Sequence, residues 1–228
     1  MSLTYAIPDI HGRLDLLEQA LSRILEHAGN RTARVVTLGD YVDRGPNARG
    51  VIEFLMQWSF PNLQLVALKG NHEVMMWEAC NNLVEAEWWI KNGGSMTLAS
   101  YGEIVPGVLL RDVIPQHHLE WIAKLPAYFA DPKRVFVHAG LDPRLPLNQQ
   151  SERALLWRRY PKDSKSGHGS RHVVHGHHAE AGGPIVSPGR TNLDTMAWKT
   201  GRLVVGVFLD EKPGGAVEFL GISGDPLE

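Results

Sequence analysis

The sequence has little cysteine, no surplus of basic residues and no long apolar run, and each shortage excludes a class of protein. The single cysteine, Cys80, rules out an internal disulfide framework and is typical of a reducing cytoplasm. The 23 Lys and Arg residues face 25 Asp and Glu residues, so no basic excess can neutralise nucleic-acid phosphates. No apolar stretch approaches the roughly 20 residues that cross a bilayer, and no charged start leads into a signal core. We therefore expect a soluble, cytoplasmic protein without a nucleic-acid or membrane partner.

The length and composition fit one globular unit. The chain has 228 residues, of which 43% are hydrophobic and 21% charged. Domains usually contain roughly 100–200 residues, and these fractions are ordinary for soluble domains. Because the chain contains no internal repeat, low-complexity tract or linker, we predict a single domain over residues 1–228.

Short apolar runs alternate with amphipathic segments along most of the chain. One helix is predicted between Gly12 and Gly29, a second over residues 48–58, and a third from His72 to about Ile90. An antiparallel hairpin is predicted near the C-terminus, over residues 202–209 and 216–220. This alternation indicates an α/β fold. The other predicted strands are residues 3–7, 33–38, 63–68, 134–137 and 171–174.

Polar clusters follow these five strands directly. Asp40 follows Asp9 by 31 residues and Asn71 follows Asp40 by the same interval, which suits one strand–helix unit. Since the carboxyl ends of strands are where α/β sheets bind ligands, we expect the clusters to meet at one edge. The clusters are Asp9–Gly12, Gly39–Gly45, Gly70–Glu73, Val137–Gly140 and His175–His178.

The clusters offer carboxylate, amide and imidazole ligands and no thiolate. Such a mixture favours Mn²⁺, Fe, Zn²⁺ or Ni²⁺ over metals that prefer sulfur. Six ligands are too many for one ion with an open position, but they suit two ions about 3.5–4 Å apart that share a carboxylate. The candidate ligands are Asp9, His11, Asp40, Asn71, His138 and His177.

Five motifs occur in a fixed order: D-x-H, GDYVDRG, GNHE, VHAG and a final GH. Together they resemble the calcineurin-like metallophosphoesterases, and GDYVDRG resembles the phosphoprotein phosphatase branch, which includes lambda phage phosphatase and bacterial diadenosine tetraphosphate hydrolase. The segment WIKNGGSMTLASYG, residues 89–102, resembles the bacterial members. The resemblance covers residues 5 to about 195. It implies a β-sandwich core flanked by helices, with the metal site at the carboxyl ends of the strands.

The resemblance also implies how the ligands are shared. Asp9 and His11 would hold a first metal ion, Asp40 would bridge two ions, and the second ion would be held by Asn71, His138 and His177. Manganese is the first expectation for both ions. His177 is favoured as the last ligand because Gly176 precedes it, as in the family motif, and His175 remains the alternative.

Further residues match the family's catalytic positions. His72 resembles the general acid for the leaving oxygen, and Asp43 would orient it and keep it protonated. Arg44 resembles the phosphate clamp. Arg159, two residues after Trp157, stands where bacterial relatives place a second phosphate-binding arginine, and Arg158 is the less favoured candidate.

The implied reaction is hydrolysis of a phosphoester by a hydroxide that bridges the two metal ions. The branch implies a phosphorylated serine or threonine in a protein, or a small phosphomonoester, as substrate. The alternative is a dinucleotide such as diadenosine tetraphosphate, whose base the tryptophan-rich segment 77–101 would accept, although the chain is short for that relative. A catalytically silent binding module is disfavoured because all six ligands are present.

The remaining histidines are expected to have no role at the site. We place His117, His118, His168 and His172 at the surface or in loops. Cys80 is expected to be an inert buried thiol. Substrate specificity is expected to lie in the loops around the metals, over residues 92–115 and 148–170.

Overall fold

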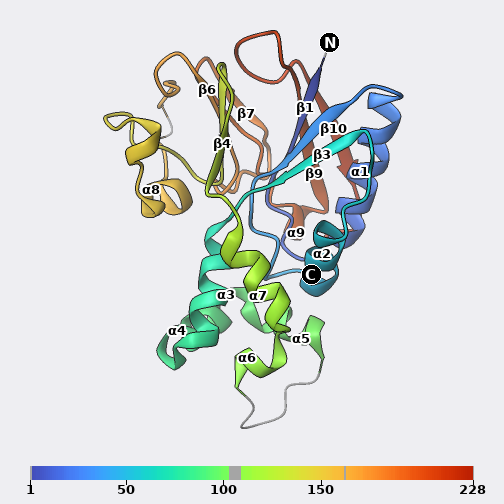
Figure 1. Ribbon diagram of the computed structural model, residues 1–228, viewed down its shortest axis with the longest axis vertical. Helices are drawn as coiled ribbons and strands as arrows, with labels where there is room; N and C mark the ends of the chain where they lie inside the picture. The colour runs from blue at the N-terminus through green and yellow to red at the C-terminus, as the bar shows by residue number, and fades with distance from the viewer. Residues whose placement is uncertain (1, 103–108, 162, 228) are drawn as a thin grey trace.

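The computed structural model describes residues 2–102, 109–161 and 163–227, which form two facing five-stranded sheets with helices around them (Figure 1). Three neighbouring strands of each sheet are parallel, and an antiparallel hairpin extends the first sheet. In spatial order the first sheet contains β10 (Glu218–Ser223), β9 (Arg202–Leu209), β1 (Leu3–Ile7), β2 (Ala33–Thr37) and β3 (Leu63–Ala67). The second contains β4 (Tyr128–Ala130), β5 (Arg134–Val137), β6 (His172–His175), β8 (Arg190–Asn192) and β7 (Ile185–Ser187).

The helices cover the outer faces of the sandwich and one of its ends. In Figure 1, α1 and α2 lie beside the first sheet, α8 lies beside the second, and α3 to α7 gather below both. The helices are α1 (Leu14–Ala28), α2 (Ala48–Met56), α3 (Asn71–Asn81), α4 (Leu83–Trp89), a π-helical turn (Ile90–Gly94), α5 (Ser95–Tyr101), α6 (Leu110–Val113), α7 (Gln116–Lys124), a 3₁₀ turn (Leu147–Gln149), α8 (Glu152–Trp157) and α9 (Ala197–Thr200).

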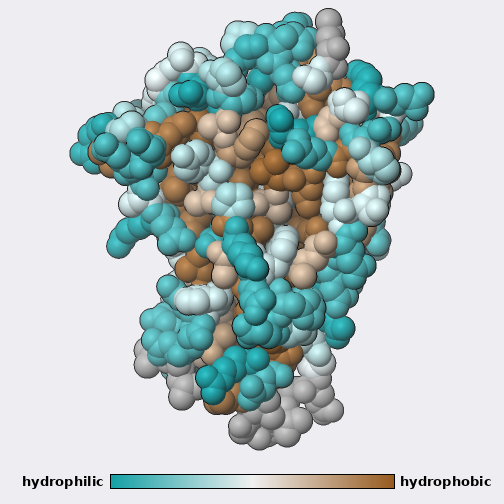
Figure 2. Space-filling view, viewed as in Figure 1, coloured by the Kyte–Doolittle hydropathy of each residue, from teal (hydrophilic) through white to brown (hydrophobic). Residues whose placement is uncertain are grey.

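The hydrophobic core has a layer between the sheets and a layer on each outer face. In β1, Ala6 packs toward the opposite sheet while Tyr5 and Ile7 pack against the helices, because neighbouring side chains of a strand point to opposite faces. Figure 2 shows hydrophobic residues in the middle of one face, where the sheets meet, and hydrophilic ones around its margin. The layer between the sheets contains Ala6, Val36, Leu38, Leu68, Phe136, Val174, Leu193 and Phe208.

The structure confirms the predicted α/β fold with a sandwich core, and it shifts several element boundaries. The single helix expected from His72 to Ile90 is divided: α3 ends at Asn81 because Asn82 adopts an extended conformation (φ −141°, ψ 117°), and α4 follows. The predicted strand at 171–174 begins one residue later, at His172.

Two histidines that were expected at the surface are buried. His118 is 1% exposed and its Nδ1 lies 2.8 Å from the Tyr101 hydroxyl, whereas its neighbour His117 is exposed. His172 is 4% exposed and its Nε2 lies 2.9 Å from Thr191 Oγ1. A hydrogen bond in the core offsets the cost of burying a neutral imidazole. Neither partner, Tyr101 or Thr191, could be identified from the sequence around the histidine.

Cys80 is buried, as expected, and burial raises the pKa of its thiol to about 11. Within the described part of the chain, no helix has both the length and the apolar character that a bilayer crossing requires.

Candidate metal centre

The polar clusters meet where the carboxyl ends of the two sheets face each other. Ile7, Thr37 and Ala67 are in register across β1, β2 and β3, so the loops that carry Asp9, Asp40 and Asn71 leave the first sheet at the same edge. The loops after β5 and β6 bring His138 and His177 from the second sheet. The structure therefore places the clusters together, although two sheet edges contribute instead of the one that was expected.

Asp40 lies at the centre of this arrangement. Its Oδ2 is 3.4 Å from His11 Nε2, and its Oδ1 is 3.4 Å from His138 Nε2. The described residues contain two groups of three side chains whose ligand atoms lie within 4.8 Å of one another inside each group. One group is His11, Asp40 and His72, and the other is Asp40, His138 and His177. Asp40 alone belongs to both, so its carboxylate is the one placed to be shared.

The loops that present these side chains have an unusual backbone. Among the described residues, six that are not glycine have positive φ, and five of them are predicted site residues. Such conformations cost of order 1–3 kcal/mol each and persist only where surrounding contacts impose them. The five are His11 (φ 44°), Asp40 (φ 54°), Asp43 (φ 72°), Arg44 (φ 69°) and His177 (φ 62°).

Glu73 holds the backbone of the Asp40 loop. Its carboxylate accepts hydrogen bonds from the backbone N–H groups of Asp40, Tyr41, Val42 and Gly70, at 2.7–3.3 Å. Burial raises the pKa of this carboxyl group to about 7, against the opposing effect of those N–H donors. Sequence analysis assigned Glu73 no role, although an acid three residues after Gly70 at the start of α3 is a helix-capping pattern that could have suggested one.

Gly176 allows the two sheets to approach each other at Asp9. A Cβ atom on Gly176 would lie 2.0 Å from Asp9 Oδ1, so only glycine fits there. The adjacent His177 N–H then donates to the same carboxylate oxygen at 3.0 Å. His175, the alternative ligand, is buried away from Asp40: its Nδ1 lies 2.9 Å from the Gly176 carbonyl and its Nε2 3.2 Å from Arg190 Nη1. The structure thus brings His177 into the ligand group and leaves His175 outside it.

The chemistry of the donor set fits a bound cation. His138 Nδ1 donates to the Leu38 carbonyl at 2.9 Å, and burial lowers the pKa of this histidine to about 3, so Nε2 carries a lone pair. The Nε2 atom lies 2.8 Å from Asn71 Oδ1, which is also an acceptor. Two acceptor atoms this close would be accommodated if both bound the same positive ion. Burial, followed by the charge of Asp9, also raises the pKa of Asp40, and a cation would offset that cost.

His72 is held on one side by a buried carboxylate. Its Nδ1 lies 2.6 Å from Asp43 Oδ2, and Asp43 also accepts from Trp89 Nε1 at 2.9 Å and from the Thr97 hydroxyl at 2.7 Å. Trp89 and Thr97 were not predicted as site residues. They come from the tryptophan-rich segment, and their two donors fix the carboxylate that orients the His72 ring.

Arg44 closes the other side of the His72 ring. Its guanidinium donates to His11 Nε2 at 2.7 Å and to His72 Nε2 at 3.0 Å, and it lies 5.5 Å from the Trp198 ring centroid. Burial, then the charge of Arg44, lowers the pKa of His72, and burial raises that of Asp43 to about 7. These directions oppose the expectation that Asp43 keeps His72 protonated. In this arrangement His72 Nε2 accepts a hydrogen bond from Arg44 and therefore carries no proton.

A cavity of about 210 Å³ opens over these ligands. Arg44, His72 and Arg159 line it, together with Asp9, Asp40, Asn71 and His177. Asp194 also lines it, although sequence analysis missed this residue: it is 4% exposed, and burial raises its pKa to about 6. Asp194 follows β8 as the predicted clusters follow their strands, but β8 is only three residues long and its sequence, RTN, is not apolar.

Comparison with known proteins agrees with this arrangement. Residues 4–206 match the family model of the calcineurin-like phosphoesterases. Over 90 residues, 40% of the chain, it is 31% identical to serine/threonine-protein phosphatase 2 of Escherichia coli K12, and the matched stretch spans 38% of that relative.

Solved structures share the fold. A crystal structure provisionally described as a diadenosine tetraphosphatase is 21% identical, with a TM-score of 0.67, and the match covers 97% of this chain and 93% of that one. A protein serine/threonine phosphatase from Saccharomyces cerevisiae is 14% identical, with a TM-score of 0.62, over 100% of this chain and 81% of that one. The family match over nearly the whole chain is decisive: the protein belongs to the calcineurin-like phosphoesterase family.

Proposed function

We propose that the protein is a metal-dependent hydrolase of phosphomonoesters, and that phosphorylated serine or threonine in proteins is its first candidate substrate. The observation that carries this proposal is the Asp40 carboxylate, which two groups of ligands share beneath a cavity lined by Arg44 and Arg159. Asp9 and His11 would hold one ion with Asp40, and Asn71, His138 and His177 would hold the other. Two such ions, with Mn²⁺ as first choice, would activate water and neutralise phosphate oxygens.

The other residues of the cavity bind the phosphate and supply a proton. The guanidinium groups of Arg44 and Arg159 present planar forks of donors that match two phosphate oxygens. When Arg44 engages phosphate it releases His72 Nε2, which can then carry a proton to the leaving oxygen. Asp43 keeps the ring in place for this transfer through the bond to Nδ1.

Metal removal tests the proposal. Protein stripped with EDTA is expected to release no phosphate from an aryl phosphate or a phosphoserine peptide and no nucleotide from diadenosine tetraphosphate, and added Mn²⁺ should restore hydrolysis of at least one of them. The ranking of the three substrates distinguishes a protein phosphatase from a dinucleotide hydrolase. Folded protein that remains inactive on all three with Mn²⁺, Fe²⁺, Zn²⁺ and Ni²⁺ would refute the proposed function.

A pair of tryptophans favours the dinucleotide hydrolase as the second candidate. Trp88 of α4 and Trp157 at the end of α8 line the same cavity, with ring centroids 5.9 Å apart and planes inclined by 35°. They remain 44% and 37% exposed, which is unusual for such large apolar side chains beside a polar site. Aromatic surface next to bound phosphate suits a substrate that carries a nucleobase.

Trp88→Leu tests this second candidate. Base stacking on an aromatic side chain contributes about 1–3 kcal/mol, so KM for diadenosine tetraphosphate should rise by about fivefold or more, with little change for a phosphoserine peptide. Trp77→Leu is the matched control, because Trp77 is equally exposed and lines a different cavity. Equal effects of Trp88→Leu on both substrates would argue against nucleobase binding at this pair.

A further inference from the structure

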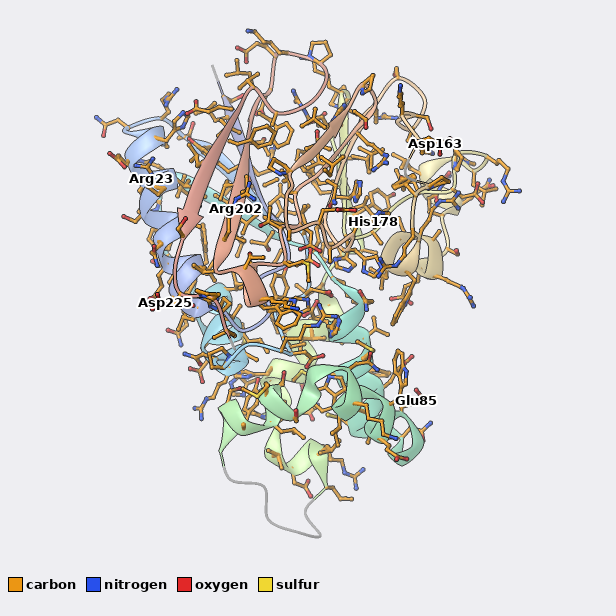
Figure 3. All side chains as sticks on the ribbon, turned by 180° about the vertical axis from the view of Figure 1, so that it is seen from behind. Arg23, Glu85, Asp163, His178, Arg202 and Asp225 are labelled. Atoms are coloured by element: carbon orange, nitrogen blue, oxygen red, sulfur yellow. The ribbon has the colours of Figure 1, made fainter. Side chains whose placement is uncertain are left out.

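A second cavity adjoins the metal centre, and apart from Arg159 its lining residues have no part in the chemistry described above. It has a volume of about 470 Å³ and lies between β7, β8 and the segment that follows α8. Arg159 and Ala179 line both this cavity and the one above the metal ligands, so the two are neighbours. Figure 3 shows His178, which also lines the second cavity, between the strands and α8.

Arg190 is a fixed, buried cation in the wall of this cavity. The residue is 4% exposed, and its guanidinium lies 4.8 Å from the Tyr160 ring centroid. Its Nε donates to the Ser164 carbonyl at 3.0 Å and its Nη1 lies 3.2 Å from His175 Nε2. None of the hydrogen bonds within the described chain uses Nη2, so this nitrogen keeps donors for a ligand. A buried arginine held this firmly is a preorganised anion-binding group.

Arg159 supplies a second, uncommitted cation. It is exposed, and it makes neither a hydrogen bond nor an ion pair with any residue in the described ranges. Glu180 is the single acid in the lining, so the two arginines leave the cavity with a positive excess. Two guanidinium groups from different segments, one fixed and one free, form the kind of site that binds phosphate.

We propose that this Arg159–Arg190 cavity binds a second phosphate group of the substrate while the scissile phosphate occupies the metal centre. The inference rests on the proposed function and specifies its substrate class. Because Arg159 borders both cavities, the two phosphates must lie close together on one molecule. Neighbouring phosphates occur in a phosphoanhydride chain and in a peptide with closely spaced phosphoserines, and both sources would present the same group to Arg190.

The charge at the cavity rim provides the test. Ile185 of β7 lines this cavity but not the one above the metal ligands, and it is 41% exposed, so substitutions should leave the fold intact. At low ionic strength, Ile185→Glu should raise KM about three- to tenfold for ADP or for a peptide with two adjacent phosphoserines, and Ile185→Lys should lower it. Ile185→Gln is the matched neutral control and should stay within about twofold of wild type.

An aryl phosphate, which has a single phosphate group, tests the proposed function separately from the second-phosphate site. Its KM should be the same in wild type and Ile185→Glu. If the aryl phosphate is hydrolysed and Ile185→Glu also leaves KM for both doubly phosphorylated substrates unchanged, the second-phosphate site is refuted while the proposed function stands. A response confined to ADP or to the peptide identifies the source of the second phosphate.

Binding to metal-stripped protein gives a readout that does not depend on catalysis. In EDTA, calorimetry with tripolyphosphate should show binding by wild type that is weakened about three- to tenfold in Ile185→Glu and unchanged in Ile185→Gln. This experiment remains decisive even if no substrate is hydrolysed. Equal affinity in wild type and Ile185→Glu would overturn the proposal.

Discussion

Asp40→Asn is expected to lower kcat toward an aryl phosphate by at least about 10³-fold, which corresponds to roughly 4 kcal/mol of transition-state stabilisation. Asparagine has the shape of aspartate but not its charge. Its oxygen can still accept the hydrogen bond that His72 N–H donates to Asp40 Oδ1 at 3.0 Å. Asparagine also tolerates the positive φ of 54° at this position, so the backbone should be retained. The expected loss therefore reports the missing negative charge.

The measurement combines steady-state kinetics with metal content and melting temperature. Wild type should retain two ions per chain, Asp40→Asn fewer, and the two proteins should melt within a few degrees of each other. Asp163→Asn removes the same charge at an exposed position that does not line the cavity, and it should behave as wild type. Near-normal activity with two bound ions in Asp40→Asn would show that Asp40 is not the shared ligand.

His72→Gln is expected to affect substrates according to their leaving groups. For a phosphoserine peptide, whose alkoxide leaves poorly without a proton, kcat should fall by about 10²–10⁴-fold. For p-nitrophenyl phosphate, whose phenolate leaves without protonation, the loss should be less than about tenfold. Glutamine can still donate to Asp43, which lies 2.6 Å from His72 Nδ1, so the pocket should keep its shape.

The difference between the two losses in kcat shows whether His72 donates a proton or only supports the structure of the site. A general loss of shape would slow both reactions by the same factor. His117→Gln makes the same substitution at an exposed histidine outside the cavity and should leave both rates unchanged. Equal losses on both substrates in His72→Gln would exclude His72 as the acid and leave it a positioning residue.

The strands and the ligand loops could be predicted from the sequence because their signals are local. Val35 and Val36 lie in a short apolar run that stops at Gly39, and β2 ends two residues before that glycine. The same reasoning failed within residues 72–90, where the hydrophobic pattern continues but Asn82 interrupts the helix. Local propensity predicts the existence of an element better than its end, because the end depends on what the chain packs against.

The sequence by itself therefore determined the fold class and the family, and it predicted a set of metal ligands. Motif order and spacing place Asp9, Asp40 and Asn71 after successive strands, and parallel strands deliver such residues to one edge. The choice of His177 over His175 as a ligand depended on the glycine at position 176. The spacing of the motifs does not explain why a glycine is needed there, because the reason is the close approach of Asp9 from the other sheet.

Only the tertiary structure decided which side chains distant in the sequence meet. Glu73 is an ordinary acid in the sequence, yet it accepts four backbone donors that hold the Asp40 loop. Trp88 and Trp157 come from separate helices and touch only because α4 and α8 both border the cavity. Arg190 and Arg159 line one cavity because the segment that follows α8 passes beside β8, where the Ser164 carbonyl accepts from Arg190. Such contacts depend on how the whole chain packs, so they cannot be predicted from local sequence patterns.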